Sequence, residues 1–346
     1  MIRRKILRCK WLPPILVVVE SIVTPNNALR QYFLKRVFWI NRETTSQLEA
    51  CFVKLVDSKL TEPIRVARAV KRYGTSWDLS PSRRVDDHWQ LRIDALLRDI
   101  GVEKDKPIAL VAMRYATYYE KLRRTRSEDE VGSETNPNTF IRNPDIVTYK
   151  AALERLVGLG VQPIHFGIDT PPVPHELRHL IIDYSCDFRL EESDLLLASR
   201  CLMMVTGAAG AWVLPSLFNR PVLFTNSYWY FISGPSSRDR FLPQLLWNET
   251  EGRLLTFREM VGVGGQYSYR DNCERDHIIP IKNSSSELTA AVGEMVSRIH
   301  GTFIEDESDR QLHSEFKKLM ILTQPAIMSQ APIATTFLRK YSYLLS

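Results

Sequence analysis

The chain has 346 residues, which is enough for two medium-sized domains with a substantial core. Apolar residues make up 44% of it and charged residues 25%, so disorder is excluded as the default. The formal net charge of +6 is a mild excess, and since no recognisable nucleic-acid-binding module accompanies it, we expect no nucleic-acid partner.

Much of the positive charge lies near the N-terminus, and most often such charges form a solvated surface. The alternative is attraction to an anionic ligand or to the anionic inner face of a membrane. Ile15 to Val19 is a short apolar run that predicts a buried strand, and Pro13, Pro14 and Glu20 keep it well below the length of a membrane span. We therefore expect a cytoplasmic protein, with peripheral contact to the inner membrane face as an alternative.

The five cysteines are irregularly spaced and include no Cys-x-x-Cys pair. This pattern predicts a reducing compartment and no structural zinc site. The chain also lacks the spaced His, Asp and Glu motifs that are typical of metal sites. We therefore expect neither a metal nor another cofactor.

Residues 1–105 predict a reduced, helix-rich first domain. After the first strand, apolar residues recur at helical spacing over residues 44–60, 62–72 and 87–100. Gly101 is a natural end for the last of these helices. Few strands are visible in this part of the chain.

From residue 107 to residue 226, predicted strands alternate with predicted helices. The strands are expected at 108–113, 161–166, 180–182, 201–205 and 222–224. The helices are expected at 143–159, near 176, at 192–198 and at 211–218, whereas 115–139 reads as a long polar loop. This alternation predicts an α/β protein with a doubly wound parallel sheet.

Beyond Asn226 the chain is rich in aromatic residues and is expected to be loop-like around a short helix at 256–261. Amphipathic helices are expected at 285–300 and 308–320, and the last residues form either a final helix or a docking tail. We place the second domain at 106–320 and the tail at 321–346.

The sequence Thr206-Gly207-Ala208-Ala209-Gly210 joins a predicted strand to a predicted helix. The first amides of a helix have no intrahelical partner and carry the positive end of its dipole, so this turn is a candidate site for a diphosphate. An equally weighted alternative is that the glycines only let the helix pack closely on the sheet. Pro215 is compatible with the helix only in its first turn.

Polar residues follow four predicted strands, at ends that a parallel sheet places along one edge: Arg114, His165 with Gly167, Asp183, and Thr206 with Gly207. Arg114 is suited to bidentate binding of a diphosphate. Asp183 is suited to bind ribose hydroxyls or to transfer a proton.

Each of these residues also has a structural alternative. Arg114 would then be a surface residue, and Asp183 would cap a turn. For His165 the favoured interpretation is an ordinary hydrogen-bonded histidine. Ser193 and Asp194 either contact a base or sugar or cap their own helix.

The segment Ile141–Tyr149, IRNPDIVTY, resembles the YRN-D---Y motif of a bacterial family of glycosyltransferases found with surface-polysaccharide genes, with Ile141 in place of the first Tyr. The likeness covers residues 107–302, through Pro163–Gly167, Ile181–Tyr184, Ser193-Asp194, Cys201 and Thr206–Gly210. The resemblance implies a GT-B-like fold of two Rossmann-like lobes, of which the N-terminal one is reduced here. It also implies a metal-independent enzyme that moves a sugar from a nucleotide-diphosphate sugar to a glycan or lipid-linked acceptor in polysaccharide synthesis.

The family's HVRD motif is matched here by Ala112-Met113-Arg114-Tyr115, which keeps the Arg but not the His or the Asp. The resemblance implies catalytic roles for Arg114 and Asp183. It places these residues at the donor site: Asn143, Asp145, His165, Gly167, Tyr184, Ser193, Asp194, Thr206, Gly207, Ala208, Ala209 and Gly210. The lost His and Asp favour an alternative, a non-catalytic scaffold that binds a nucleotide sugar or glycan; a sugar-nucleotide epimerase is a third hypothesis.

Overall fold

The computed structural model describes residues 87–125, 143–207, 209–227, 236–263, 266–323 and 331–345, together with three short N-terminal strands. Strand β1 (Arg3–Leu7) pairs antiparallel with β2 (Ile15–Val19), and β2 pairs parallel with β3 (Phe38–Ile40). The strand predicted at 15–19 is therefore confirmed. The helices predicted at 44–60 and 62–72 lie outside the described residues.

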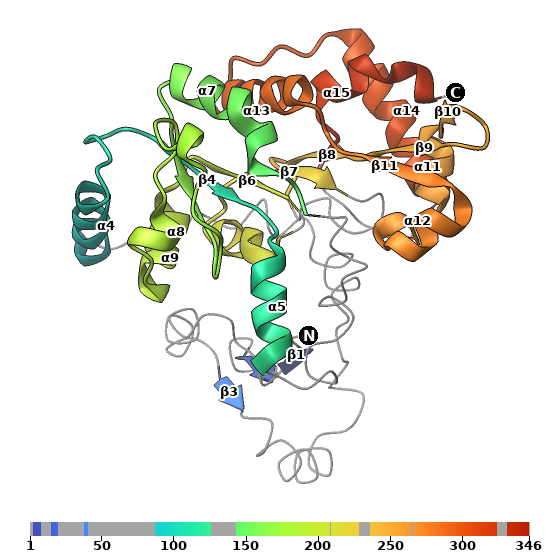
Figure 1. Ribbon diagram of the computed structural model, residues 1–346. Helices are drawn as coiled ribbons and strands as arrows, with labels where there is room; N and C mark the ends of the chain where they lie inside the picture. The colour runs from blue at the N-terminus through green and yellow to red at the C-terminus, as the bar shows by residue number, and fades with distance from the viewer. Residues whose placement is uncertain are drawn as a thin grey trace.

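The centre of the molecule is a five-stranded parallel sheet (Figure 1). Its strands are β4 (Ile108–Ala112), β5 (Gln162–His165), β6 (Met203–Thr206), β7 (Val222–Ser227) and β8 (Arg240–Pro243). They lie in the order β5-β4-β6-β7-β8, and every neighbouring pair is parallel. The predicted α/β class is confirmed, and the strand order is compatible with a Rossmann-like fold.

Helices cover both faces of this sheet, as a parallel sheet requires. On the upper face in Figure 1, α7 (Lys150–Gly158) packs against α13 (Ser285–Ile299), and α13 packs against α15 (Thr335–Lys340). The other face carries α8 (Tyr184–Asp187), α9 (Glu191–Arg200) and α10 (Val213–Leu217). Helix α4 (Asp87–Asp99) packs on α9, where the Trp89 indole nitrogen donates to Ser199 Oγ over 3.1 Å.

Two predictions of irregular structure are wrong. Helix α5 (Ala116–Thr125) occupies the first part of the expected loop at 115–139, because its Glu, Lys, Leu and Arg residues are good helix formers. The region after Asn226 contains β8 and an antiparallel sheet of β10 (Arg253–Leu254), β9 (Leu245–Asn248) and β11 (Ile278–Ile281). These strands are two to four residues long, too short to show periodicity.

The remaining elements are short apart from α14. The α-helices are α11 (Phe257–Val263), α12 (Arg270–Asp276) and α14 (Glu307–Thr323). The 3-10 helices are η3 (Ile146–Tyr149), η4 (His175–Leu177), η5 (Gly210–Trp212), η6 (Gln266–Ser268) and η7 (Ser342–Leu345). The helices expected at 87–100, 256–261, 285–300 and 308–320 are confirmed as α4, α11, α13 and α14.

Short pieces of chain cover both edges of the parallel sheet. Ile182 forms a single parallel bridge with Ile164 of β5, in place of the strand predicted at 180–182. At the other edge, Ile333 bridges Phe241 of β8, and the Ala334 amide donates to the Phe241 carbonyl over 2.9 Å. The segment 331–345 is thus built into the sheet edge, which it protects from pairing with another chain.

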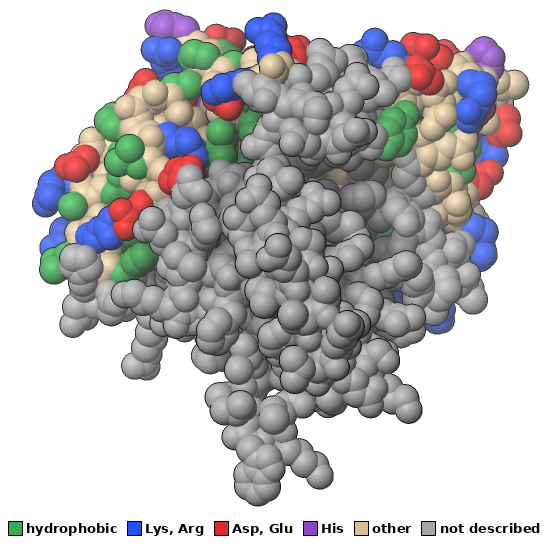
Figure 2. Space-filling view, turned by 90° about the horizontal axis from the view of Figure 1, so that it is seen from below, with side chains coloured by type: hydrophobic (Ala, Val, Ile, Leu, Met, Phe, Trp, Pro, Cys, Tyr) green, Lys and Arg blue, Asp and Glu red, His purple; other side chains and the backbone are tan. Residues whose placement is uncertain are grey.

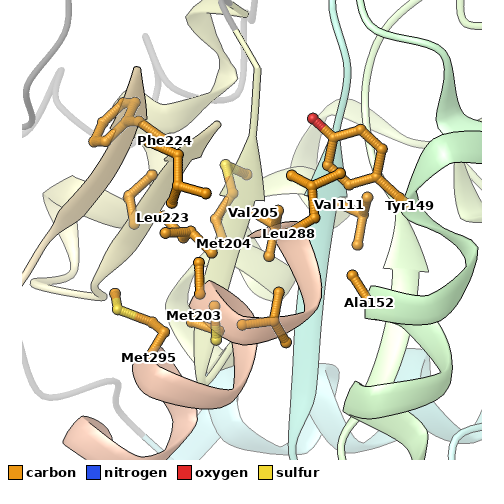
Figure 3. Close-up of a cluster of buried hydrophobic side chains, with 14 of the residues drawn as sticks. Val111, Tyr149, Ala152, Met203, Met204, Val205, Leu223, Phe224, Leu288 and Met295 are labelled. Atoms are coloured by element: carbon orange, nitrogen blue, oxygen red, sulfur yellow. The ribbon is translucent and has the colours of Figure 1, made fainter. Parts of the chain in front are cut away.

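A buried core fixes the carboxyl ends of the strands (Figure 3). The core is formed by side chains of three strands and by side chains of the helices that cover them. The strands contribute Met203, Met204 and Val205 of β6, Val111 of β4, and Leu223 and Phe224 of β7. The helices contribute Leu288 and Met295 of α13, Ala152 of α7, and Tyr149 just before α7. Such close packing leaves little freedom to the residues that follow these strands. The core therefore holds the loops at this edge of the sheet in fixed positions.

Candidate functional site

The sheet has a topological switch point between β4 and β6. The chain leaves β4 to form β5 on one side, whereas β6, β7 and β8 follow on the other side. In open α/β sheets, ligands bind outside the carboxyl ends of the strands at such a point. Arg114 follows β4 and Gly207 follows β6, so both lie at the expected place.

Arg114 is a buried cation at this switch point. Only 2% of its surface is exposed, and its Nη1 donates to the side-chain oxygen of Asn143. The next residue, Pro144, packs on Gly207, where an added Cβ would lie 3.2 Å from the Pro144 ring. Three residues that were predicted separately for the donor site, Arg114, Asn143 and Gly207, are therefore brought together.

The glycine turn after β6 differs from the expected cradle of amides. The Gly207 amide donates to the Ala112 carbonyl over 3.2 Å, and the Ala209 amide donates to the Gly207 carbonyl over 2.8 Å. Thr206 Oγ1 also donates to the Ala112 carbonyl, over 2.9 Å. Two of the amides predicted to bind a diphosphate are therefore bonded within the chain; Ala208 lies outside the described residues.

The helix that follows the glycine turn is shorter than predicted. In place of one helix over 211–218, η5 (Gly210–Trp212) leads into the five residues of α10. Pro215 lies in the first turn of α10, as its ring requires. So short a helix has a small dipole, and positive charge for an anion has to come from side chains.

Lys282 supplies a second cation that the sequence did not reveal. Its Nζ donates to the main-chain oxygen of Asn143 over 2.6 Å, so the ammonium and the Arg114 guanidinium hold the two oxygen atoms of one residue. Burial lowers the pKa of Lys282, and the negative charge of Asp145 partly offsets this. No motif marks Lys282, because its role depends on a contact with a residue 139 positions away.

The backbone that carries Lys282 is firmly held. The Asn226 amide donates to Asn283 Oδ1 over 2.6 Å, and the Asn283 amide donates back to Asn226 Oδ1 over 2.8 Å. Asn226 Nδ2 also donates to the Tyr149 hydroxyl over 2.8 Å. Burial raises the pKa of Tyr149 to about 12, so this phenol stays neutral within the network. Lys282 is thereby fixed beyond the end of β7.

His165 and Asp183 form a buried pair at the end of β5. His165 Nδ1 lies 2.9 Å from Asp183 Oδ1, and the Val173 amide donates to Asp183 Oδ2 over 2.7 Å. Burial alone would raise the pKa of Asp183, but the hydrogen bonds from His165 and Val173 outweigh it and hold the pKa below its ordinary value. The carboxylate is therefore charged at neutral pH.

Tyr115, which the sequence analysis did not place in the site, extends this pair toward the surface. Its hydroxyl lies 3.0 Å from His165 Nε2, and the two rings meet edge to face. Burial, followed by the charge of Asp183, raises the pKa of Tyr115 above its ordinary value. Asp183 and His165, which are buried, and Tyr115, which is partly exposed, thus form one hydrogen-bonded line.

Tyr184, Ser193 and Asp194, which were also predicted for the donor site, lie at the starts of α8 and α9. The Tyr184 hydroxyl donates to Asp194 Oδ1 over 2.9 Å, and Arg189 donates to Asp194 Oδ2 over 2.8 Å. Burial raises the pKa of Asp194 to about 6 despite the charge of Arg189. Ser193 beside it is buried as well. Tyr184 and Asp194 are thus engaged mainly with the chain itself.

Asp145 and Gly167 have clear local roles. Asp145 is exposed and caps η3 by accepting from the Val147 amide over 2.9 Å. A Cβ at Gly167 would lie 2.6 Å from the Thr170 methyl group, so no larger residue fits there without a shift. These roles explain the residue types without a ligand.

Figure 2, which views the molecule from below, shows acidic and basic side chains interspersed on the described surface that is visible at the margins. In the ranges that the structure describes, no group of three His, Cys, Asp or Glu residues could hold a metal ion. Within the same ranges, no helix is both long and apolar enough to cross a membrane.

Comparison of the chain with protein-family models, with curated proteins and with solved structures finds no significant match. The function is therefore argued from the geometry of the strand ends.

Proposed function

We propose that the protein is a glycosyltransferase that uses a nucleotide-diphosphate sugar, and that the parallel sheet is its donor-binding lobe. The observation that carries the proposal is the pair of cations at the switch point, the Arg114 guanidinium and the Lys282 ammonium, both held by Asn143. A diphosphate leaving group carries negative charge that grows as the sugar departs. Positive charge fixed beside it stabilises the transition state more than the ground state.

Preorganisation supports the same conclusion. Arg114 is buried and held through Asn143, and Lys282 is held by the Asn226–Asn283 pair. Cations fixed before the ligand arrives need little reorganisation during the reaction. Arg114 presents a planar fork, suited to two oxygen atoms of one phosphate, whereas Lys282 presents a point charge.

The finer architecture is part of this proposal. In a GT-B-like arrangement the sheet described here is the C-terminal lobe, and residues 1–105 belong to a reduced lobe on the acceptor side. The acceptor would be a glycan, either free or on a lipid carrier, that enters beside the carboxyl edge of β4 and β5. The basic N-terminus would then rest on an anionic membrane surface.

Calorimetric titration with UDP, GDP, ADP, CDP and dTDP tests the donor site. We expect the wild type to bind at least one of them, and Arg114→Ala to weaken that binding about 100-fold, or about 3 kcal/mol. Arg114→Lys should lose less, since it keeps the charge but not the fork. Arg310→Ala, which removes an exposed arginine paired with Glu307 on α14, is the matched control.

Two results would contradict the proposal. If the wild type binds none of the five nucleotides, the sheet is not a nucleotide-diphosphate donor lobe. If Arg114→Ala binds as tightly as Arg310→Ala while its unfolding temperature is unchanged, the guanidinium has no part in binding.

One observation favours a second candidate, a binding protein without transferase activity. The amides of Gly207 and Ala209 are bonded within the chain, and both oxygens of Asp183 already accept hydrogen bonds. Such a protein would bind nucleoside diphosphates, and Arg114→Ala would weaken the binding, yet no sugar would leave the donor. Release of nucleoside diphosphate from a panel of nucleotide sugars, with and without cell-extract acceptors, separates the two functions.

A further inference from the structure

We propose that Tyr115 takes the proton from the attacking acceptor hydroxyl and passes its own proton to His165, whose orientation Asp183 fixes. This inference rests on the proposed transferase function and assigns its base. Tyr115 would be the catalytic residue, because it is partly exposed, whereas His165 and Asp183 are buried and act through it as positioning residues.

The hydrogen-bond pattern sets the direction of proton flow. The charged Asp183 carboxylate can only accept, so His165 Nδ1 carries the proton between them. In the neutral imidazole, Nε2 then holds the lone pair and can accept from the Tyr115 hydroxyl, 3.0 Å away. The Val173 amide holds the second carboxylate oxygen, so the carboxylate cannot turn away from the imidazole.

Burial closes the other routes to His165. Its side chain has 0% exposure, and its two ring nitrogens face Asp183 and Tyr115. A proton from outside can therefore reach the imidazole only through the Tyr115 hydroxyl. A tyrosine whose pKa lies above its ordinary value rests as the neutral phenol, so it accepts a proton only as it gives one up.

Arg114 and Tyr115 are adjacent in the sequence, and their side chains diverge from the end of β4. Arg114 reaches Asn143, next to Pro144 and the end of β6, whereas Tyr115 reaches His165 at the end of β5. Arg114, the cation for the leaving group, and Tyr115, the acceptor of the proton, thus lie on opposite sides of the end of β4. A sugar held between them has its diphosphate on one side and the incoming hydroxyl on the other.

The proposed step is balanced within donor, acceptor and protein. The acceptor oxygen forms a bond to the anomeric carbon, while the bond from that carbon to the diphosphate oxygen breaks and its electron pair leaves on the nucleoside diphosphate. The acceptor proton moves to the Tyr115 oxygen as the Tyr115 proton moves to His165 Nε2. The resulting imidazolium is paired with the Asp183 carboxylate until the Tyr115 hydroxyl gives a proton to solvent and takes one back from His165 Nε2, which restores the starting state.

The test compares wild type, Tyr115→Phe and His165→Asn in two measurements. Calorimetry gives the affinity for the nucleoside diphosphate that the wild type binds. A panel of nucleotide sugars carrying that nucleoside gives kcat and KM for nucleoside diphosphate release, to water and to cell-extract acceptors. Tyr341→Phe is the matched control, because it also removes one phenol hydroxyl from a partly buried tyrosine, at Glu287 on α13.

We expect Tyr115→Phe and His165→Asn to lower kcat about 100-fold or more, the scale of general base catalysis, with nucleoside diphosphate affinity within about twofold of wild type. If Tyr115, His165 and Asp183 had a purely structural role, the substitutions would instead change the affinity and the unfolding temperature. The measured kcat would then fall only as far as the fraction of folded protein falls. The control should keep its kcat.

The inference is overturned if Tyr115→Phe keeps kcat within about threefold of wild type. It is also overturned if the wild type binds a nucleoside diphosphate but releases none from any sugar of the panel, in which case the donor site stands as a binding site alone. A wild type that binds no nucleoside diphosphate removes the proposed function, and the relay with it.

Discussion

Two regions of the molecule hold charged side chains in opposite ways. Under the C-terminal segment, Glu294 accepts from Arg298 over 2.8 Å and from the Thr335 and Thr336 amides over 3.0 and 2.9 Å. In the same region, Arg339 binds Asp309, and Lys340 binds Glu287 over 2.6 Å. Each carboxylate there meets a cation of the same chain.

At the carboxyl edge of the sheet, the acceptor that Arg114 and Lys282 share is the neutral residue Asn143. A neutral acceptor helps to fix a cation and adds no negative charge of its own, whereas a carboxylate adds one. The comparison therefore sets carboxylate acceptors, which fasten the fold, against a neutral acceptor shared by two cations. Substitutions in the first region should change stability, and those in the second should change binding.

The largest effect is expected for Glu294→Ala. It removes one of the two carboxylates that Arg298 contacts and leaves the Thr335 and Thr336 amides without their side-chain acceptor. Breaking a buried ion pair in this way costs about 3–5 kcal/mol. The free energy of urea unfolding measures the loss, and nucleoside diphosphate affinity of the folded protein should not change. Glu307→Ala, at an ion pair on the surface of α14, is the control and should cost less than about 1 kcal/mol. A loss as small as that of the control would show that the buried cluster does not fasten the segment.

Asp194 is an intermediate case, in which burial outweighs the neighbouring cation Arg189 and the pKa rises to about 6. The folded protein then keeps a proton that the unfolded chain has released, over the range from the ordinary value of 3.8 to about 6. Stability contributed by Asp194 is therefore present at low pH and is lost as the pH rises through about 6. The expected change over the whole titration is about 3 kcal/mol.

Urea unfolding of wild type and Asp194→Asn at several pH values measures this change. The stability of wild type relative to the variant should fall as the pH rises from about 4 to about 6, and should be level above that range. If the difference in stability between wild type and Asp194→Asn does not depend on pH, the pKa of Asp194 lies near its ordinary value. Arg189 would then compensate fully for the burial of this carboxylate.

The doubly wound sheet was predictable because its strands are buried on both faces and so read as apolar runs. Ile108–Ala112 and Val222–Ser227 are wholly buried. The strands β9, β10 and β11 were not predictable, since their pairing with one another, and not their own pattern, defines them. The helix α5 was missed because its ten residues are mostly polar and it lies in a longer polar segment.

The candidate site, too, was predictable from the sequence only in part. The end of β4 and the end of β5 locate Arg114 and His165 on one edge, and this follows from strand order alone. The contacts of Lys282 with Asn143 and of Tyr115 with His165 join residues 139 and 50 positions apart, and no local pattern encodes them. The hydrogen bond between Tyr184 and Asp194 depends likewise on packing, and their contact with a sugar stays a prediction.

The smallest expected effects come from two lysines that test the comparison directly. Lys282→Ala should weaken nucleoside diphosphate binding about 10-fold, or about 1.4 kcal/mol, and leave the free energy of unfolding within about 0.5 kcal/mol of wild type. Lys340→Ala should lower the free energy of unfolding by about 1 kcal/mol and leave binding unchanged, because Lys340 is half-exposed and paired with Glu287. Calorimetry and urea unfolding on both variants decide the matter. If both substitutions changed the same one of these two quantities, the comparison would fail. The type of acceptor that a lysine contacts would then not determine whether its charge contributes to stability or to ligand binding.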